Sequence, residues 1–512
     1  MPMSTRARLR NPFASRTPRK HKDVAKPKLF LFILLVRLVN ATTLETYFQA
    51  DEFYQCLEPA HRLVYGYGYL TWEWHQKLRS SIHPLIYALG YLVAGENRFL
   101  IRQMPKVIGA VVASVGDFYL HEFVQVYDND GGGGGGNLGW VALCLSLLNP
   151  FNWYVSTRSF SNNLETTLTI VALRYWPWDH EIGKGSWYIS LACGVVSCII
   201  RPTNALIQIP LGIWLLVNTR ISRTSAEWIY LSVLVVLAIL ALSTGLDYLF
   251  YGELTFPLYN FLEFNVIKNL SIFYGVAPWH FYIAQAIPLM MMTYIPMLVY
   301  GIRCSILLAT SLIYLAGLSL LQHKEFRFIL PLQPIMLYYA ARGYRKLKAK
   351  YLVILGVFAN IAIALFFANV NERGVMDLVD FLESTNSSVG FVMPCHSTPW
   401  QSHFHNPDLQ MWFLTCEPPL HLNAPTLDEI KAYRDESDQF YDDPAGFLAR
   451  RFGTDLVEPE YVAIFSPLEK VIDQELGGRY IESNRFFNSY FHWDGRRNGD
   501  IVLYRKIDHN LE

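Results

Sequence analysis

Charged side chains are scarce in this sequence, and their scarcity excludes the commonest kind of protein. Asp, Glu, Lys and Arg make up 17% of its 512 residues, whereas 52% are hydrophobic. A soluble chain of this length would need several domains and more surface charge. Basic and acidic residues number 43 each, so no net charge indicates nucleic acid as a partner. The composition therefore predicts an α-helical polytopic membrane protein with some soluble mass attached.

Metal-binding and phosphate-binding motifs are lacking as well. The seven cysteines show neither C-x-x-C spacing nor the Cys/His spacing of a zinc site, so no metal is predicted. The glycine run at residues 131–136 lacks the Lys-Ser/Thr of a phosphate-binding loop and is interpreted as a spacer. Cys395 and Cys416 lie in a polar region and could form a disulfide if that region is lumenal.

Apolar runs divide the chain into a tail, a membrane domain and a polar C-terminal region. Residues 1–28 hold nine basic residues and one acidic residue, directly before an apolar run, which predicts a cytosolic tail and a signal anchor. The alternatives are a cleaved signal peptide and a basic arm for nucleic acid or anionic lipid. A membrane domain of about eleven helices is predicted over residues 29–369, with 187–218 counted as one broken span. The apolar runs lie near residues 29–44, 83–95, 107–124, 138–156, 159–175, 187–218, 227–249, 280–301, 304–321, 328–341 and 351–369.

Short basic loops give the predicted orientation. Residues 218–223 and 342–350 are basic and belong in the cytosol, because Lys and Arg stay on that side. Residues 96–106 fall on the same side by this count. The first loop, residues 45–82, then lies in the lumen.

The C-terminal region, residues 370–512, is predicted on the lumenal side with the first loop. It is polar and carries short strand-like runs, which predicts a small α+β domain. A transporter is the alternative from another class, since it would also have many spans and intramembrane charge. No inverted internal repeat of the kind that many transporters show is found.

Asp51 and Glu52 are the first candidates for chemistry. They follow the first apolar run closely, so a carboxylate there lies at the membrane–water boundary, within reach of a lipid headgroup. Adjacent residues on a helix face different directions, so we expect only one of the two to point into a given site. The alternative is a solvated pair at a helix N-terminus, where acidic residues are favoured.

Aromatic residues crowd the rest of the first loop. Tyr67, Trp72 and Trp74 are candidates for stacking on the sugar rings of an acceptor. The alternative is that these rings anchor the loop at the membrane interface.

Four ionisable residues, His323, Lys324, Glu325 and Arg327, interrupt two apolar runs. Snorkelling to the membrane surface would explain Lys324 and Arg327 alone. Two cations suit an anionic headgroup, above all a phosphate, which Arg binds with two hydrogen bonds. The cluster therefore predicts binding of a lipid-linked phosphate.

These residues carry a resemblance to a known family. "HKEFRF" matches the H-K-E-x-R-F signature of the dolichyl-phosphate-mannose-dependent mannosyltransferases of glycosyltransferase family 22, and "ADEFYQCLEPAH" resembles the acidic first-loop motif of that family. The longer stretches "GYGYLTWEW" and "MPCHSTPWQSHFH" narrow the likeness to members that build the glycosylphosphatidylinositol (GPI) anchor. The resemblance implies a GT-C type glycosyltransferase in the endoplasmic reticulum membrane, with its active site facing the lumen.

The resemblance also implies the reaction. The donor is dolichyl phosphate mannose, the acceptor is the GPI-precursor glycolipid, and mannose joins the second core mannose in an α1,2 bond with inversion. Asp51 is the expected base, with Glu52 as a supporting group or alternative base. Arg327 and Lys324 are expected to stabilise the leaving phosphate beside Glu325, and His323 to protonate it or bind it by a hydrogen bond. No cofactor is expected.

Two related reactions stay open within this family. The chain could act on the lipid-linked oligosaccharide of N-glycan synthesis, or it could add the fourth GPI mannose.

Overall fold

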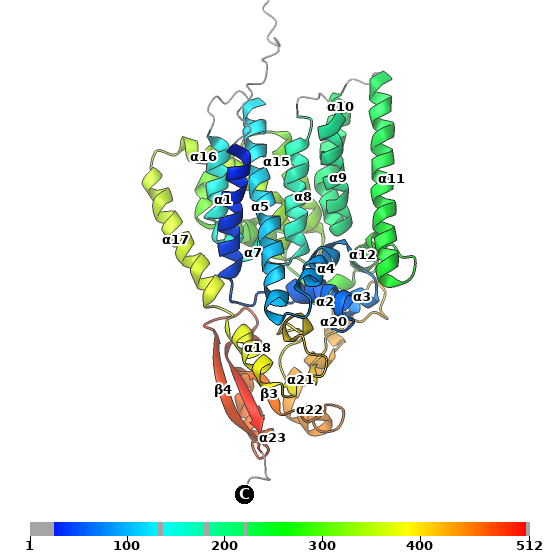
Figure 1. The fold of residues 1–512 in the computed structure, drawn as a ribbon, viewed down its shortest axis with the longest axis vertical. Coiled ribbons are helices and arrows are strands. Elements are labelled where there is room, and N and C mark those ends of the chain that lie inside the picture. The colour runs from blue at the N-terminus through cyan, green and yellow to red at the C-terminus, as the bar shows by residue number, and fades with distance from the viewer. Residues whose placement is uncertain (1–24, 131–136, 179–183, 220–222, 508–512) are drawn as a thin grey trace, which may run out of the picture.

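Long helices form one end of the molecule and a small mixed domain forms the other (Figure 1). The computed structural model describes residues 25–130, 137–178, 184–219 and 223–507. Most of the predicted basic tail and the glycine run lie outside the described residues. The long helices and the shorter helices aligned with them are α1 (Ala25–Thr42), α5 (Arg98–Asp130), α6 (Leu138–Leu147), α7 (Pro150–Val155), α8 (Ser161–Tyr175), α9 (Lys184–Ile200), α10 (Ala205–Asn218), α11 (Arg223–Tyr251), α13 (Ile287–Met291), α14 (Ile295–Gly301), α15 (Ile306–Leu320), α16 (Gln333–Lys346) and α17 (Lys350–Asn369).

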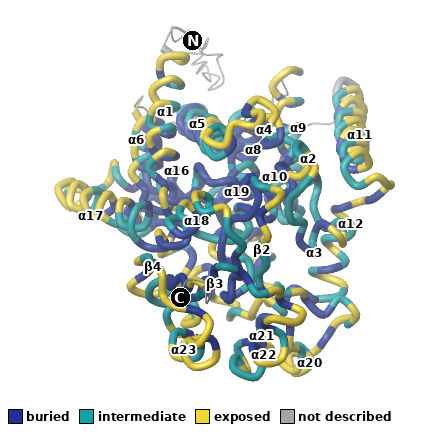
Figure 2. Tube along the Cα trace, turned by 60° about the horizontal axis from the view of Figure 1, so that its bottom comes forward, coloured by how far each residue is buried: buried dark blue, intermediate teal, exposed yellow. Residues whose placement is uncertain are grey.

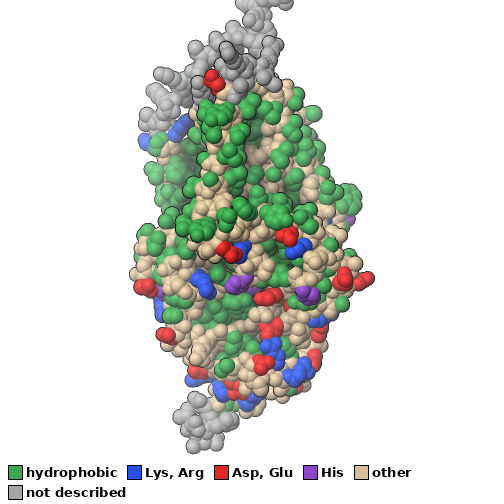
Figure 3. Space-filling model, turned by 90° about the vertical axis from the view of Figure 1, so that its right-hand side faces the viewer, with side chains coloured by type: hydrophobic (Ala, Val, Ile, Leu, Met, Phe, Trp, Pro, Cys, Tyr) green, Lys and Arg blue, Asp and Glu red, His purple; other side chains and the backbone are tan. Residues whose placement is uncertain are grey.

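The outer faces of these helices are apolar. Figure 3 shows hydrophobic side chains covering the helical end, while charged side chains gather at the other end. Four helical stretches of the described residues, 98–128, 227–251, 282–301 and 350–385, are long and apolar enough to cross a membrane. In α17, for example, Tyr351, Leu355 and Phe358 are exposed, although water would disfavour them there. Lipid is the solvent that fits this surface.

Close helix contacts depend on small residues at one place in the bundle. A Cβ atom on Gly301 of α14 would collide with the carbonyl oxygen of Tyr339 of α16, and one on Gly343 would collide with that of Met297. Backbones approach this closely in membrane bundles where glycine removes the side chain.

The apolar run 187–218 forms two antiparallel helices, so the prediction of one broken span is wrong. The chain reverses at Arg201–Asn204, where the short 3₁₀ turn η2 (Pro202–Asn204) separates α9 from α10. Ser197 donates a hydrogen bond to the Asn204 side chain at 2.9 Å. Gly194 lies against the side chain of Gln208, which confirms that the two helices run side by side.

The run 83–95 also differs from its prediction. Helix α4 (Ile82–Ala94) has 13 residues, a length of roughly 20 Å that is too short for a bilayer core. Beyond it, Arg102 forms ion pairs with Asp380 and Glu383 of the C-terminal region. The prediction that 96–106 lies on the side opposite the C-terminal region is therefore wrong. One predicted membrane span is lost at α4, and one is gained because α9 and α10 are separate helices. The number of spans therefore stays at about eleven, as a prediction.

The C-terminal region contains a five-stranded sheet of order β2-β1-β3-β5-β4. β1 (Val389–Phe391) is parallel to β2 (Met411–Phe413) and to β3 (Tyr461–Phe465), while β5 (Gly499–Lys506) is antiparallel to β3 and to β4 (Tyr480–Ser489). This region also includes α18 (Gly374–Thr385), α19 (Gln401–Phe404), α20 (Leu427–Ala432), α21 (Glu436–Asp442), α22 (Pro444–Arg451) and α23 (Glu469–Leu476). The predicted α+β architecture is confirmed.

Alternate residues of the central strands face two separate cores. Val462, Ile464 and Val502 pack with the helices α21 to α23. Ala463 and Leu503 face the other way and share a core with the first loop. Figure 2 shows the buried segments continuing from the bundle into this region. One face of the sheet therefore supports the first loop directly.

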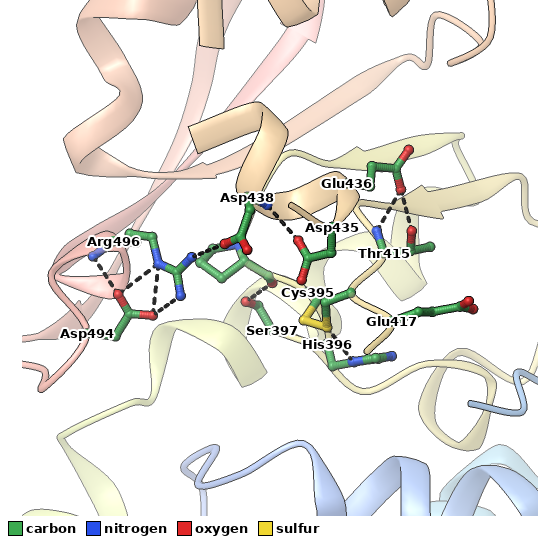
Figure 4. The surroundings of a disulfide bond; sticks show 12 residues. Cys395, His396, Ser397, Thr415, Glu417, Asp435, Glu436, Asp438, Asp494 and Arg496 are labelled. Atoms are coloured by element: carbon green, nitrogen blue, oxygen red, sulfur yellow. Dashed lines mark hydrogen bonds and ion pairs between the residues drawn. A yellow bond between two sulfur atoms is a disulfide. The ribbon is translucent and has the colours of Figure 1, made fainter. Parts of the chain in front are cut away.

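The disulfide that the sequence allowed is present. Cys395 and Cys416, which follow β1 and β2, are bonded (Figure 4). His396 lies beside the bond, with its Nδ1 atom 3.6 Å from the Cys416 sulfur. The ligand atoms of these three residues lie within 4.8 Å of one another, but both thiols are taken up by the disulfide.

Candidate active site

The first loop contains a continuous helical segment that starts at Asp51 and passes through the π-helical turn η1 (Phe53–Leu57) into α2 (Glu58–Tyr65). π-Helical turns occur frequently at functional sites. The Tyr47 hydroxyl donates to the carbonyl oxygen of His396 at 2.6 Å, and the Tyr54 hydroxyl donates to that of Thr398 at 3.1 Å. The C-terminal region thus fixes the position of the turn that carries Asp51.

Asp51 and Arg327 are in direct contact, which joins the two sequence motifs. Arg327 also binds Glu325 through two hydrogen bonds, from Nε at 2.7 Å and from Nη2 at 2.9 Å. The guanidinium is buried, whereas the Asp51 side chain keeps 24% of its surface exposed. A carboxylate held by a buried cation and still open to solvent can receive a proton from a bound hydroxyl group.

Two carboxylates share this one guanidinium, and their pKa values move apart. Burial raises the pKa of the Asp51 carboxyl. The charge of Arg327 lowers this pKa, and the charge of Glu325 raises it further. Burial acts on Glu325 too, but Arg327 and His323 outweigh it and hold the pKa of that carboxyl below its usual range. Asp51 is therefore the better proton acceptor of the two.

His323 and Lys324 both bind the backbone of residues 275–277, which precede α13. They thereby hold the loop that carries "HKEFRF" in place. His323 contacts the carbonyl oxygen of Gly275 through Nδ1 at 3.1 Å and Glu325 through Nε2 at 3.2 Å. The two contacts hold the imidazole ring between the two segments. Lys324 donates to the carbonyl oxygens of Ala277 (2.8 Å), Leu321 and Gln322 (3.5 Å). These contacts occupy its N–H groups, so Lys324 orders the loop, and its contact with a phosphate stays a prediction.

Two further arginines near Arg327 were missed by the sequence interpretation. Arg79 binds Glu73 with two hydrogen bonds, at 2.8 and 2.9 Å. Arg201 lies 3.5 Å from Glu165, and both Arg79 and Arg327 are close enough to interact with its charge. The signal was available for Arg201, because it interrupts an apolar run. Arg327 therefore lies near two further guanidinium groups, and this concentration of positive charge suits an anionic ligand.

Glu52 points away from this site. Its carboxylate accepts a hydrogen bond from Arg158 at 2.9 Å, and it lines a cavity of about 500 Å³ on the other side of η1. Asp51 does not line that cavity. The expectation that only one of the two carboxylates enters a given site is confirmed.

The predicted stacking surface is wrong for two of its three residues. Trp74 is 2% exposed and donates from its ring nitrogen to the Tyr54 carbonyl oxygen at 3.0 Å. Trp72 is 6% exposed and packs against Phe264. Helix α3 (Trp72–His75) therefore uses both indoles to hold the loop together. Tyr67 is half-buried, and its contact with a sugar stays a prediction.

Comparison with known proteins decides the family. The model of the Alg9-like mannosyltransferase family matches residues 28–405. The chain belongs to this family. Both motifs fall within the match, as do Arg79, Arg158 and Arg201.

Curated relatives extend the match beyond the family. GPI mannosyltransferase 3 of Candida albicans is 60% identical over 93% of this chain and 97% of its own length. GPI mannosyltransferase 3 of Saccharomyces cerevisiae is 33% identical over 94% of this chain and 97% of its own. This member of the Alg9-like family is therefore a mannosyltransferase of GPI synthesis.

A solved structure gives the fold. ArnT from Cupriavidus metallidurans, in its complex with undecaprenyl phosphate, superposes with a TM-score of 0.56 over 94% of this chain and 98% of its own, at 12% identity. The apo form of the same protein gives a TM-score of 0.58. This Alg9-like mannosyltransferase thus has the GT-C fold.

Proposed function

We propose that the protein transfers mannose from dolichyl phosphate mannose to the 2-hydroxyl of the second mannose of the GPI precursor, forming an α1,2 bond. The contact between Asp51 and Arg327 carries this proposal, because it joins a base to a phosphate-binding cation. The name shared by the curated relatives supports the acceptor. Arg79 and Arg201 supply further positive charge near that contact.

The reaction is a single displacement at the anomeric carbon of the donor. The acceptor hydroxyl oxygen bonds to C1 of mannose while its proton passes to Asp51. The bond between C1 and the phosphate oxygen breaks, and its electron pair leaves with dolichyl phosphate. Because attack and departure occur on opposite faces, a β-linked donor gives an α-linked product. Arg327 stabilises the charge that develops on the leaving phosphate.

The resting contact gives the order of events. Asp51 and Glu325 share Arg327. A donor phosphate competes with Asp51 for the guanidinium, and this competition releases the carboxylate to act as a base. Glu325 stays with Arg327 through its two hydrogen bonds and keeps the guanidinium oriented.

We place this site in the lumen of the endoplasmic reticulum. The basic loops at 218–223 and 342–350 belong in the cytosol under the positive-inside rule, and the first loop then faces the other side. A tag inserted near Asn386, which is exposed, should resist protease in intact microsomes. Digestion of the tag without detergent would overturn the orientation.

The test is transfer by the purified full chain. Labelled dolichyl phosphate mannose is supplied with a GPI precursor bearing two mannoses, one bearing three, or an N-glycan lipid-linked oligosaccharide. We expect label only on the two-mannose GPI precursor, in a linkage that an α1,2-mannosidase removes. Transfer to either other acceptor would assign the chain to one of the alternative reactions.

A further inference from the structure

The cavity on the Glu52 side of the first loop has no role in the mechanism above. Its volume is about 500 Å³, and its walls come from the end of α1, the start of α5, the first loop, the segment between α7 and α8, α18 and α19. We call it the Glu52 cavity. Both charged and apolar side chains line it, including Phe53 and Phe99.

The charges of the Glu52 cavity are almost all paired. Each of its five carboxylates forms an ion pair with one of three arginines. Three of these pairs are Arg158–Glu52 at 2.9 Å, Arg102–Glu383 at 3.0 Å and Arg373–Glu45 at 2.8 Å.

Arg98 and Lys106 are the exceptions, since no carboxylate of the described residues lies within ion-pair distance of either. The Lys106 ammonium donates to the carbonyl oxygen of Leu44 at 3.3 Å. Arg158 and Arg102 are near enough to repel its charge, while Glu52 and Glu45, each bound to an arginine, attract it more weakly. A half-buried ammonium whose neighbouring carboxylates are already paired can bind a further anion.

Lys106 belongs to a basic face of α5 that borders exposed apolar side chains. Arg98, Arg102 and Lys106 are spaced four residues apart, so they share one face of the helix. Phe99 is 69% exposed on the same helix, and Val107, the next residue after Lys106, is also exposed and apolar. The basic face therefore runs beside exposed apolar side chains, a combination that suits a lipid with an anionic headgroup.

We propose that the Glu52 cavity binds the phosphodiester headgroup of a lipid, with Lys106 as its counter-ion. The inference rests on the proposed function for the identity of the lipid, which we take as the glycolipid acceptor. Inversion requires the acceptor and the leaving phosphate on opposite faces of the sugar, and the first loop separates the Glu52 cavity from Arg327. A resident membrane phospholipid offers the same chemistry, so the test separates the two sources.

The experiment compares two acceptors on the full-length protein in nanodiscs. One is the dimannosyl precursor with its phosphatidylinositol, and the other carries the same glycan on an octyl group without phosphate. Lys106→Met should raise KM for the phosphodiester acceptor about tenfold and leave KM for the octyl acceptor and for the donor unchanged. Lys106→Arg should restore most of the affinity, because it keeps a cation.

Lys268→Met is the matched control, since Lys268 pairs with Glu263 outside the cavity. Phospholipid that copurifies with each variant is measured by native mass spectrometry. If Lys106→Met loses copurified phospholipid while both acceptor KM values stay the same, the site is confirmed and its lipid is a resident one. If neither measurement changes, or both acceptors weaken equally, the proposal fails. Lys106→Gln replaces Lys106→Met if the latter does not fold.

Failure of the proposed function looks different. In that case the wild type transfers mannose to neither acceptor, and copurified phospholipid alone decides the site.

Discussion

Asp51 and Glu52 are adjacent in the chain, yet they have different electrostatic partners on two sides of one helical turn. Asp51 shares Arg327 with Glu325, and burial raises its pKa. Glu52 has Arg158 as its own partner and lines a separate cavity. Sharing Arg327 leaves Asp51 available as a base, whereas Glu52 forms a structural ion pair with an arginine of its own. A two-residue motif can therefore serve two sites when it forms the wall between them.

The largest expected effect tests this contrast directly. Asp51→Asn keeps the shape of the side chain but removes the base, so transfer should fall by about 10²–10⁴-fold. Glu52→Gln leaves Arg158 buried without its charge partner, so it should lower the thermal unfolding midpoint and cost less than about tenfold in turnover per folded molecule. Both are measured by initial rates and thermal unfolding. A greater loss of turnover in Glu52→Gln would reverse the assignment.

The second prediction distinguishes the role of Arg327 from that of Lys324. Arg327→Lys retains charge but loses the fork that binds Glu325, so KM for the donor should rise about tenfold or more. Lys324→Met removes the contacts to Ala277 and Leu321, and it should lower stability instead of donor affinity. Donor titrations at saturating acceptor decide the matter. A donor KM near the wild-type value in both variants would favour simple membrane anchoring by both residues.

Removing the disulfide should weaken the support of the Asp51 turn. Cys395 and Cys416 are 21 residues apart. Closing a loop of this size stabilises the folded state by about 3 kcal/mol, because it reduces the entropy of the unfolded chain. The double variant Cys395→Ser/Cys416→Ser should therefore unfold at lower denaturant concentration. Its activity should fall by less than that of Asp51→Asn, because Tyr47 still has the His396 carbonyl oxygen as a partner. An unchanged unfolding midpoint would contradict this prediction.

The smallest effect concerns the buried carboxyl of Glu58. Burial raises its pKa to about 7, although N–H groups of Ser402 and Tyr69 donate to it. The folded state therefore holds this proton more tightly than the unfolded chain, so stability contributed by Glu58 falls as pH rises from about 4.5 to 7. Glu58→Gln cannot ionise, and its unfolding midpoint should decline less between pH 5 and pH 8 than that of the wild type. Parallel declines would show that Glu58 does not titrate in this range.

Much of the fold was predictable because hydropathy and charge act locally. Apolar runs identified most of the long helices, and the polar composition after residue 370 identified the α+β region. The reversal at Arg201–Asn204 was missed because an interruption of an apolar run is equally compatible with a kinked helix and with a turn between two helices. Helix α4 was missed because an apolar stretch of 13 residues can pack against protein as well as lipid.

The site was predictable in its residues but not in their arrangement. Sequence placed Asp51 and Arg327 in two motifs, and only the tertiary fold brings them into contact. Trp72 and Trp74 show the limit most clearly, since an aromatic side chain is equally suited to packing and to ligand stacking. Lys324 shows it again, because charge alone does not reveal that carbonyl oxygens occupy an ammonium group.

The hydrogen bonds between the first loop and the C-terminal region have a consequence for biosynthesis. Tyr47, Tyr54, Glu58 and His61 all bond residues 396–405, at separations of 344 to 349 residues along the chain. A ribosome therefore completes the turn that carries Asp51 long before it makes the residues that hold that turn in place. A nascent chain that ends before residue 405 lacks some of these contacts. The newly made protein thus acquires its organised site only near the end of its synthesis.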